Sequence, residues 1–240
     1  MQGEFALWVY LTQGPLLWLT VTLAGYAVAD WLALRSGRHP LVNPVLVSVV
    51  LVGGVLVSSG TGYATYFEGA QFIHFLLGPA TVALALPLWE HRAVVRRSAV
   101  PMLAALAAGS VVAAVSAVGI VWAFGAPEAV VVAIAPKSVT AGVAMSITEG
   151  MGGDPALTAV LVILTGITGA LVVTPLMDAL GIRDYRARGF AVGLASHGIG
   201  TARAFQVDPV AGTFAGIAIG LNAVMTAVVV PALLGWWISP

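Results

Sequence analysis

Apolar segments long enough to cross a membrane as helices constrain this chain more than any other feature. They cover residues 15–34, 43–60, 72–89, 100–124, 156–177 and 210–237. A bilayer core takes about 20 apolar residues of helix, whereas strands of a membrane barrel give shorter, alternating segments. The sequence therefore predicts an all-α polytopic membrane protein with about six transmembrane helices.

Composition agrees with this class and excludes others. Only 8% of the 240 residues are charged, against roughly 25% in soluble domains. The formal net charge is zero, without a basic tract, so the sequence gives no support for nucleic-acid binding. Cysteine is absent, which excludes disulfides and thiolate metal ligands. The four histidines show no ligand spacing, so we expect neither a metal nor a cofactor.

Two further apolar stretches, residues 129–148 and 189–205, are interrupted by glycine or proline. The first contains Lys137, the only lysine of the chain, and the second contains His197 and Arg203. A charged amine at membrane depth costs several kcal/mol unless a partner, water or a ligand compensates it. Discontinuous helices that carry such groups are typical of a transport site.

The arginines predict how the chain crosses the membrane. Eight of the nine lie in three clusters: Arg35 and Arg38; Arg92, Arg96 and Arg97; Arg183, Arg186 and Arg188. Short loops rich in arginine stay in the cytoplasm. All three clusters are cytoplasmic if the N-terminus is outside and residues 129–148 enter and leave on the outer side. We therefore expect a re-entrant hairpin there; a helix that is unwound in mid-membrane but still crosses is the alternative.

The two interrupted stretches resemble each other. Val132-Ala-Ile-Ala-Pro-Lys-Ser-Val-Thr-Ala141 aligns with Val192-Gly-Leu-Ala-Ser-His-Gly-Ile-Gly-Thr-Ala202, with one residue inserted. Each follows a clean span, which predicts two inverted repeats with a site at their interface. Within a single membrane domain, residues 1–240, we expect three N-terminal spans (1–97), repeat A (98–153), repeat B (154–206) and a last span (207–240).

The first interruption has the composition of an anion site. Pro136 fits the first position of a half-helix, which would leave the N–H groups of Lys137, Ser138 and Val139 at its positive end. With the ammonium of Lys137 and the hydroxyls of Ser138 and Thr140, these donors suit a carboxylate. Alternatively, Lys137 extends to the membrane surface or pairs with an acidic residue, Glu149 or Glu128.

The second interruption supplies candidate partners. Ser196 can cap a half-helix, and Gly198 with its neighbours allows close approach of a ligand that Thr201 could also contact. His197 titrates near neutral pH and could carry a coupling proton, or be purely structural. Glu149 is a second candidate for proton coupling, with surface solvation as its alternative.

Other polar or unusual residues are secondary candidates for the site. Arg203 could bind an anion or anchor the chain at the interface, and Asn222 could form helix–helix hydrogen bonds. Pro79 and Thr81 belong to a third segment that resembles the interrupted stretches, because it repeats the Pro-x-(Ser/Thr)-Val pattern.

An enzyme is not expected. Ser138 follows Lys137 and Ser196 precedes His197, as in nucleophile–base pairs. Neighbouring residues on a helix point about 100° apart, however, which argues against a direct hydrogen bond within either pair.

The chain resembles the LrgB/CidB membrane family at three blocks, residues 136–147, 153–160 and 188–202, and upstream at residues 43–44, 66–72 and 77–85. Family members are described as holin- or antiholin-like proteins that modulate murein hydrolases and lysis with a small LrgA/CidA-type partner. Others are carboxylate transporters: bacterial pairs move pyruvate, and a plastid relative moves glycolate and glycerate.

The resemblance and the broken helices together predict a secondary transporter of small monocarboxylates (glycolate, glycerate, pyruvate or lactate), coupled to protons. A holin/antiholin-like regulator is the alternative. We favour the transporter because a holin has no need of a buried cation between broken helices. We expect a multi-pass protein of the bacterial cytoplasmic (inner) membrane. Its expected partners are the carboxylate, the lipid bilayer, further copies of the chain and an LrgA/CidA-type protein.

Overall fold

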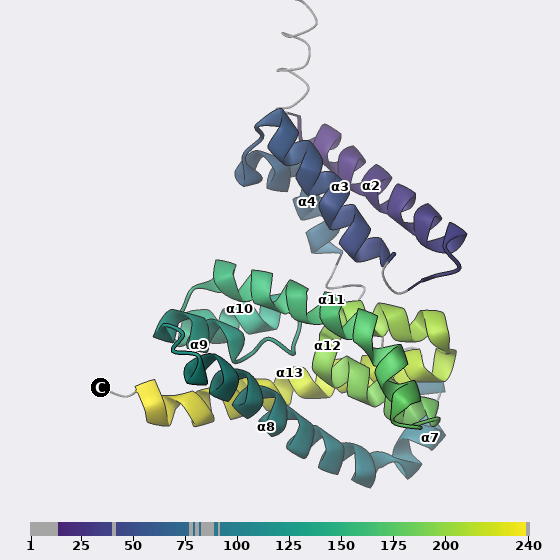
Figure 1. The fold of residues 1–240 in the computed structure, drawn as a ribbon, viewed down its shortest axis with the longest axis vertical. Coiled ribbons are helices and arrows are strands. Elements are labelled where there is room, and N and C mark those ends of the chain that lie inside the picture. Colours follow the sequence, from purple (N-terminus) through teal and green to yellow (C-terminus); the bar gives the residue numbers. More distant parts are fainter. Residues whose placement is uncertain are drawn as a thin grey trace, which may run out of the picture. The chain divides into compact units, whose positions relative to one another are not determined.

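All regular structure in the described part of the chain is helical (Figure 1). The computed structural model describes residues 14–39, 42–76, 79, 82, 89–90 and 92–238. The chain divides into two compact units, Met1–Ala83 and Leu84–Pro240, and each is described by itself.

The first unit contains α2 (Pro15–Arg35), α3 (Pro44–Ser59) and α4 (Tyr63–Phe75). Proline opens α2 and α3, and the Asn43 side chain accepts hydrogen bonds from two backbone N–H groups at the start of α3. Gly60 ends α3 in the left-handed conformation. Helices α2 and α3 match two predicted spans to within one residue at each end.

The predicted third span, residues 72–89, falls largely outside the described residues. The helix that contains Phe72 is α4, which starts nine residues earlier and ends at Phe75. A Cβ on Gly69 would meet the backbone of Pro15 and Leu19, so this glycine lets α4 pack closely on α2.

In the second unit, three long apolar helices match predicted spans to within two residues: α8 (Ala99–Ala123), α11 (Pro155–Ala179) and α13 (Pro209–Ile238). Together with α2 they are long and apolar enough to cross a bilayer. Their outward positions carry large exposed hydrophobic side chains, including Val112, Leu164 and Val224. A face of this kind is stable against lipid and not against water, so the chain is a helical membrane protein.

The first interrupted stretch forms a helical hairpin. After the short α7 (Arg92–Arg97) and α8, the chain folds into α9 (Glu128–Ile134) and α10 (Ala141–Gly150). Val131 and Ala135 pack in one cluster with Ile147 and Met151, so α10 runs back along α9. We call residues 128–150 the first hairpin and residues 135–140 its tip.

The second interrupted stretch, α12 (Tyr185–Val207), also folds back on itself. Backbone angles leave the helical region at Ser196 and His197, and a Cβ on Gly200 would touch Val192. Val192 and Ala204 belong to one hydrophobic cluster, although a straight helix would place these two residues about 18 Å apart. We call residues 185–207 the second hairpin and residues 194–197 its tip.

The two hairpins approach α11 from opposite ends. Thr158, near the start of α11, donates a hydrogen bond to Thr148 at the base of the first hairpin. Val173, near its end, packs on the base of the second. A Cβ on Gly153 would meet both Val132 and Thr148, so the two ends of the first hairpin lie together. That residues 129–148 enter and leave on one side of the membrane stays a prediction. An inverted repeat would produce this opposed entry, and the symmetry itself remains a prediction.

Helices α8 and α13 run parallel and flank both hairpins. Met102 packs near Phe214 and Ala114 packs near Val230, with a Ser110–Asn222 hydrogen bond between these levels. In Figure 1, α9 and α10 lie at the left of this unit and α7 at the right. Close packing of α12 on α13 uses Gly189 and Gly193, where a Cβ would meet backbone of α13.

Candidate functional site

The tips of the two hairpins meet at one side chain of α13. The Asn222 amide (Nδ2) donates to the backbone oxygen of Leu194 at 2.9 Å and to that of Ser138 at 3.4 Å. Its own oxygen accepts from the hydroxyls of Ser110 at 2.6 Å and Thr226 at 3.2 Å. Asn222 is 1% exposed, so this network satisfies buried backbone carbonyls at the two breaks where water is excluded.

Val162 of α11 connects the two tips from the other side. Its side chain packs against Val139 and Ala144 of the first hairpin. Its carbonyl oxygen accepts a hydrogen bond from the His197 ring, with 2.8 Å between this oxygen and Nε2. Residues about sixty positions apart in the sequence are thus held together by α11 and α13.

The first tip differs from its prediction. Pro136 does not begin a half-helix: it lies in a turn in which Lys137 N–H bonds to Ile134 and Val139 N–H bonds to Pro136. The next helix, α10, starts at Ala141. Packing of Val139 and Ala144 on Val162 selects this later start, which local sequence alone leaves open. The predicted donors at 137 and 139 are therefore used within the turn.

The start of α10 provides donors instead. Thr140 is its N-cap residue but makes no capping hydrogen bond through its side chain, unlike Asn43, Asp154 and Asp184 at the starts of α3, α11 and α12. The first N–H groups of a helix have no helical acceptor and carry its positive dipole end. A Cβ on Gly142 would meet nothing within 4 Å, so the space beside these groups is open.

Lys137 lies in the turn of residues 135–138 and is partly buried. Its ammonium donates a hydrogen bond to the Ser138 hydroxyl at 3.3 Å. In the part of the chain that the structure describes, the ion pairs are Arg186–Asp184 and Arg188–Asp178. Lys137 therefore pairs with neither of the carboxylates considered as alternatives.

The second tip is a sharp break, as predicted, at Ser196 and His197. His197 adopts φ 41° and ψ −138°, a left-handed region that costs a non-glycine residue about 1–3 kcal/mol. The cost is offset by the hydrogen bond to Val162 and by burial, since the ring packs where a Cβ on Gly166 would stand.

Ser196 does not cap the second half-helix. Its hydroxyl lies against Gly169 of α11, and the hydrogen bonds of the described residues include no cap from it. The half-helix begins at Gly198, which is exposed with nothing within 4 Å of a Cβ. Thr201 is buried one turn later and donates to the His197 carbonyl.

Other predicted residues lie away from the tips. Glu149 is exposed near the end of α10, about 12 Å along the helix from its start. Arg203 lines a small cavity with Arg188 and Tyr185 at the base of the second hairpin. Thr81 lies outside the described residues, and Pro79 is described only between undescribed neighbours.

Sequence reasoning missed the surfaces that receive the tips. Gly166 and Gly169 leave room on α11 for His197 and Ser196, and Ser110 on α8 holds Asn222. The available signal was two glycines in an otherwise apolar span, since small residues let neighbouring helices approach closely in membranes.

The chain matches the model of the LrgB-like family over residues 22–236. It is 34% identical to the uncharacterized protein YwbG of Bacillus subtilis, covering 83% of this chain and 89% of that protein. It is 30% identical to the holin-like protein CidB of Staphylococcus epidermidis (82% and 86%) and 29% identical to CidB of Staphylococcus aureus (91% and 95%). None of these descriptions is of an enzyme, and no solved structure matches the chain. With its family model matched over nearly the whole chain, the protein belongs to the LrgB-like family.

Proposed function

We propose that the protein is a secondary transporter of small monocarboxylates and that the substrate binds where the two hairpin tips meet. The observation that carries the proposal is Asn222, whose amide hydrogen-bonds the backbone of both tips beside Lys137. Glycolate, glycerate, pyruvate and lactate are the substrates we expect.

The carboxylate would be held by the first tip. Lys137 supplies a partly buried positive charge, and the uncapped start of α10 supplies N–H groups with a favourable dipole. The hydroxyls of Ser138 and Thr140 lie in the same turn. A bound carboxylate would offset the cost of placing an ammonium at membrane depth.

The second tip would face the rest of the substrate. Gly198 leaves open space at the start of residues 198–207, where a hydroxyl or keto oxygen could approach the backbone. Ser196 and Thr201 lie at the same break, although both hydroxyls face protein groups. Because His197 uses Nε2 for Val162, its Nδ1 is the atom that could exchange a coupling proton.

The names of the relatives favour a second function. Two matched proteins are called holin-like, which supports a role for this chain as a holin/antiholin-like regulator of murein hydrolases and lysis. Under either function we place the protein in the bacterial inner membrane, assembled with further copies and with a small LrgA/CidA-type protein.

Reconstitution into proteoliposomes separates the two functions. We expect saturable uptake of radiolabelled glycolate or pyruvate without release of trapped calcein. Lys137→Met should reduce uptake to the level of empty liposomes, while Arg96→Gln, which removes an exposed charge elsewhere, should leave it unchanged. Calcein release without saturable uptake would support the holin-like role and contradict transport.

Adding the LrgA/CidA-type protein to the same liposomes tests the partner. Uptake that appears only with both proteins would assign transport to the pair.

A further inference from the structure

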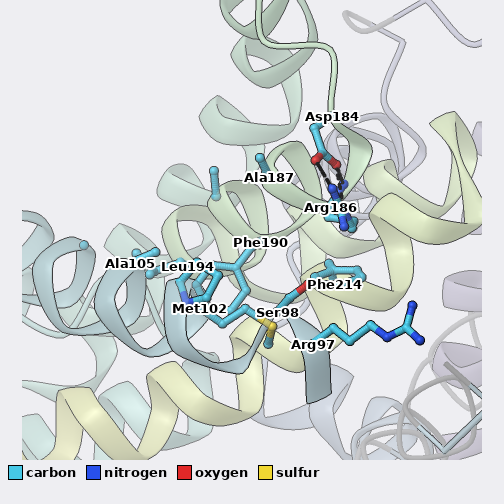
Figure 2. A pocket seen from close by; sticks show the side chains of 13 residues that line it. Arg97, Ser98, Met102, Ala105, Asp184, Arg186, Ala187, Phe190, Leu194 and Phe214 are labelled. Carbon is cyan, nitrogen blue, oxygen red and sulfur yellow. Dashed lines mark hydrogen bonds and ion pairs between the residues drawn. The ribbon is translucent and has the colours of Figure 1, made fainter. Parts of the chain in front are cut away.

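A cleft of about 610 Å³ lies between α8, the second hairpin and α13 (Figure 2), and Lys137 is not among the residues that line it. Its size falls within the range of small-molecule sites in proteins, roughly 300–1,000 Å³. Met102 and Ala105 line it from α8, Phe190 and Leu194 from α12, and Phe214 from α13.

The walls of the cleft are divided by polarity. Its charged and hydroxyl side chains, Arg97, Ser98, Asp184 and Arg186, come from the ends of α7 and the start of α12. In Figure 2, Arg97 and Arg186 lie toward one side, with Ala105 and Leu194 toward the other. Every other lining residue is apolar. A small hydrophilic carboxylate would gain hydrogen bonds only at the charged end and would leave the apolar part unfilled, whereas an amphiphile would match both parts.

The charged end of the cleft has an excess of positive charge. Arg186 is paired with Asp184, and this guanidinium holds the pKa of the Asp184 carboxyl below its ordinary value. Arg97 takes part in neither ion pair of the described residues. Arg97 lies two positions before α8, a candidate membrane span, so its guanidinium is at the depth of the lipid headgroups. Basic pockets at this depth, between membrane helices, are typical sites for acidic headgroups.

We propose that this cleft binds an anionic phospholipid of the surrounding bilayer, with its phosphate at Arg97 and an acyl chain along Met102, Phe190 and Leu194. The proposal does not depend on what the hairpin tips bind. Its structural consequence is a link to the second tip, because the Leu194 side chain packs on Gly109 and its carbonyl accepts from Asn222.

Lipid binding to the delipidated, purified full chain tests the proposal. Phosphatidylglycerol and phosphatidylcholine with identical acyl chains are added, and adducts are counted by native mass spectrometry while thermal unfolding is followed. Phosphatidylglycerol should bind more tightly and raise the unfolding temperature more. Arg97→Gln should weaken its binding about fivefold and leave phosphatidylcholine binding unchanged.

Two neighbouring residues provide matched controls. Ala105→Phe, which places a ring in the apolar part of the cleft, should weaken binding of both lipids at this site. Ala104→Phe and Arg96→Gln, one position outside the lining, should behave as the wild type. Equal binding of both lipids, with Arg97→Gln and Arg96→Gln indistinguishable, would overturn the proposal.

A cysteine at the cleft tests the other occupant. The chain has no native cysteine, so an Ala105→Cys variant carries a single thiol. Disulfide formation between two copies would identify the cleft as a subunit contact and would also overturn lipid binding, while a thiol that remains monomeric and is protected by phosphatidylglycerol supports it.

Discussion

Both hairpin tips contact α11 and α13, but the two tips are built differently. The first turns over six residues, keeps Lys137 partly buried, and leaves the start of α10 without a side-chain cap. The second turns at two residues, both almost fully buried, and holds His197 in a left-handed conformation against α11. This difference suggests a division of roles, with the first tip supplying binding groups and the second a rigid wall. Substitutions at the second tip should therefore reduce stability, and those at the first should reduce function.

The largest effect on stability is expected on the surface that receives His197. Gly166→Leu would place carbon atoms where the ring packs, since even a Cβ would lie 2.5 Å from His197 Cε1. Overpacking and loss of the Val162 hydrogen bond should destabilise the fold by about 3 kcal/mol or more. Unfolding in mixed micelles measures this. Gly119→Leu, at an exposed glycine with nothing within 4 Å of its Cβ, is the matched control and should be tolerated.

Asn222→Leu should have the next largest effect because it acts on both tips. It keeps the branched shape and the number of heavy atoms but leaves the Ser138 and Leu194 carbonyls and the Ser110 hydroxyl without this partner, at a cost of about 1–3 kcal/mol. Thr226→Val removes one hydrogen bond of the same network and should cost less than about 1 kcal/mol. Equal losses for both variants would show that the amide does not join the tips.

Helix capping gives a smaller contrast. Asp154→Ala removes the cap of α11 and should cost about 1 kcal/mol, whereas Thr140→Ala at α10 should cost less than about 0.5 kcal/mol because no cap bond is lost. Thermal unfolding of the two variants compares them. A loss at Thr140 as large as that at Asp154 would mean that α10 is capped and its donors are occupied.

The smallest effect on stability is expected at Lys137 itself. Lys137→Met keeps most of the side-chain volume and removes a partly buried charge that has no ion-pair partner among the described residues. Stability should stay within about 1 kcal/mol of the wild type or rise, since the desolvation of the ammonium is no longer required. A large loss in unfolding measurements would assign Lys137 a structural role.

The sequence predicted the parts of this structure that depend on local pattern. Apolar runs of spanning length located α8, α11 and α13, and the arginine clusters predicted the hairpin at residues 129–148 because short basic loops favour one side of the membrane. The break at Ser196 and His197 followed from glycines and polar residues in an apolar stretch.

What the sequence could not predict depends on tertiary packing. Pro136 is compatible with a turn or a helix start, and the observed turn brings Val139 against Val162 of α11, a contact that the local sequence does not show. Asn222 was expected to form helix–helix hydrogen bonds, and it forms one with Ser110 of α8. Its two backbone partners, 28 and 84 positions away in the chain, could not be read from the sequence. Gly166 and Gly169 indicate a face for close packing on α11, but the sequence does not show that the Ser196–His197 break packs there.

Equilibrium binding to the purified protein tests the central claim most directly. Radiolabelled glycolate and pyruvate are titrated against the wild type, Lys137→Met and Arg96→Gln, each checked for an unchanged unfolding midpoint. We predict saturable binding by the wild type and Arg96→Gln and none by Lys137→Met. Undiminished binding by a folded Lys137→Met variant would contradict a carboxylate site between the two tips.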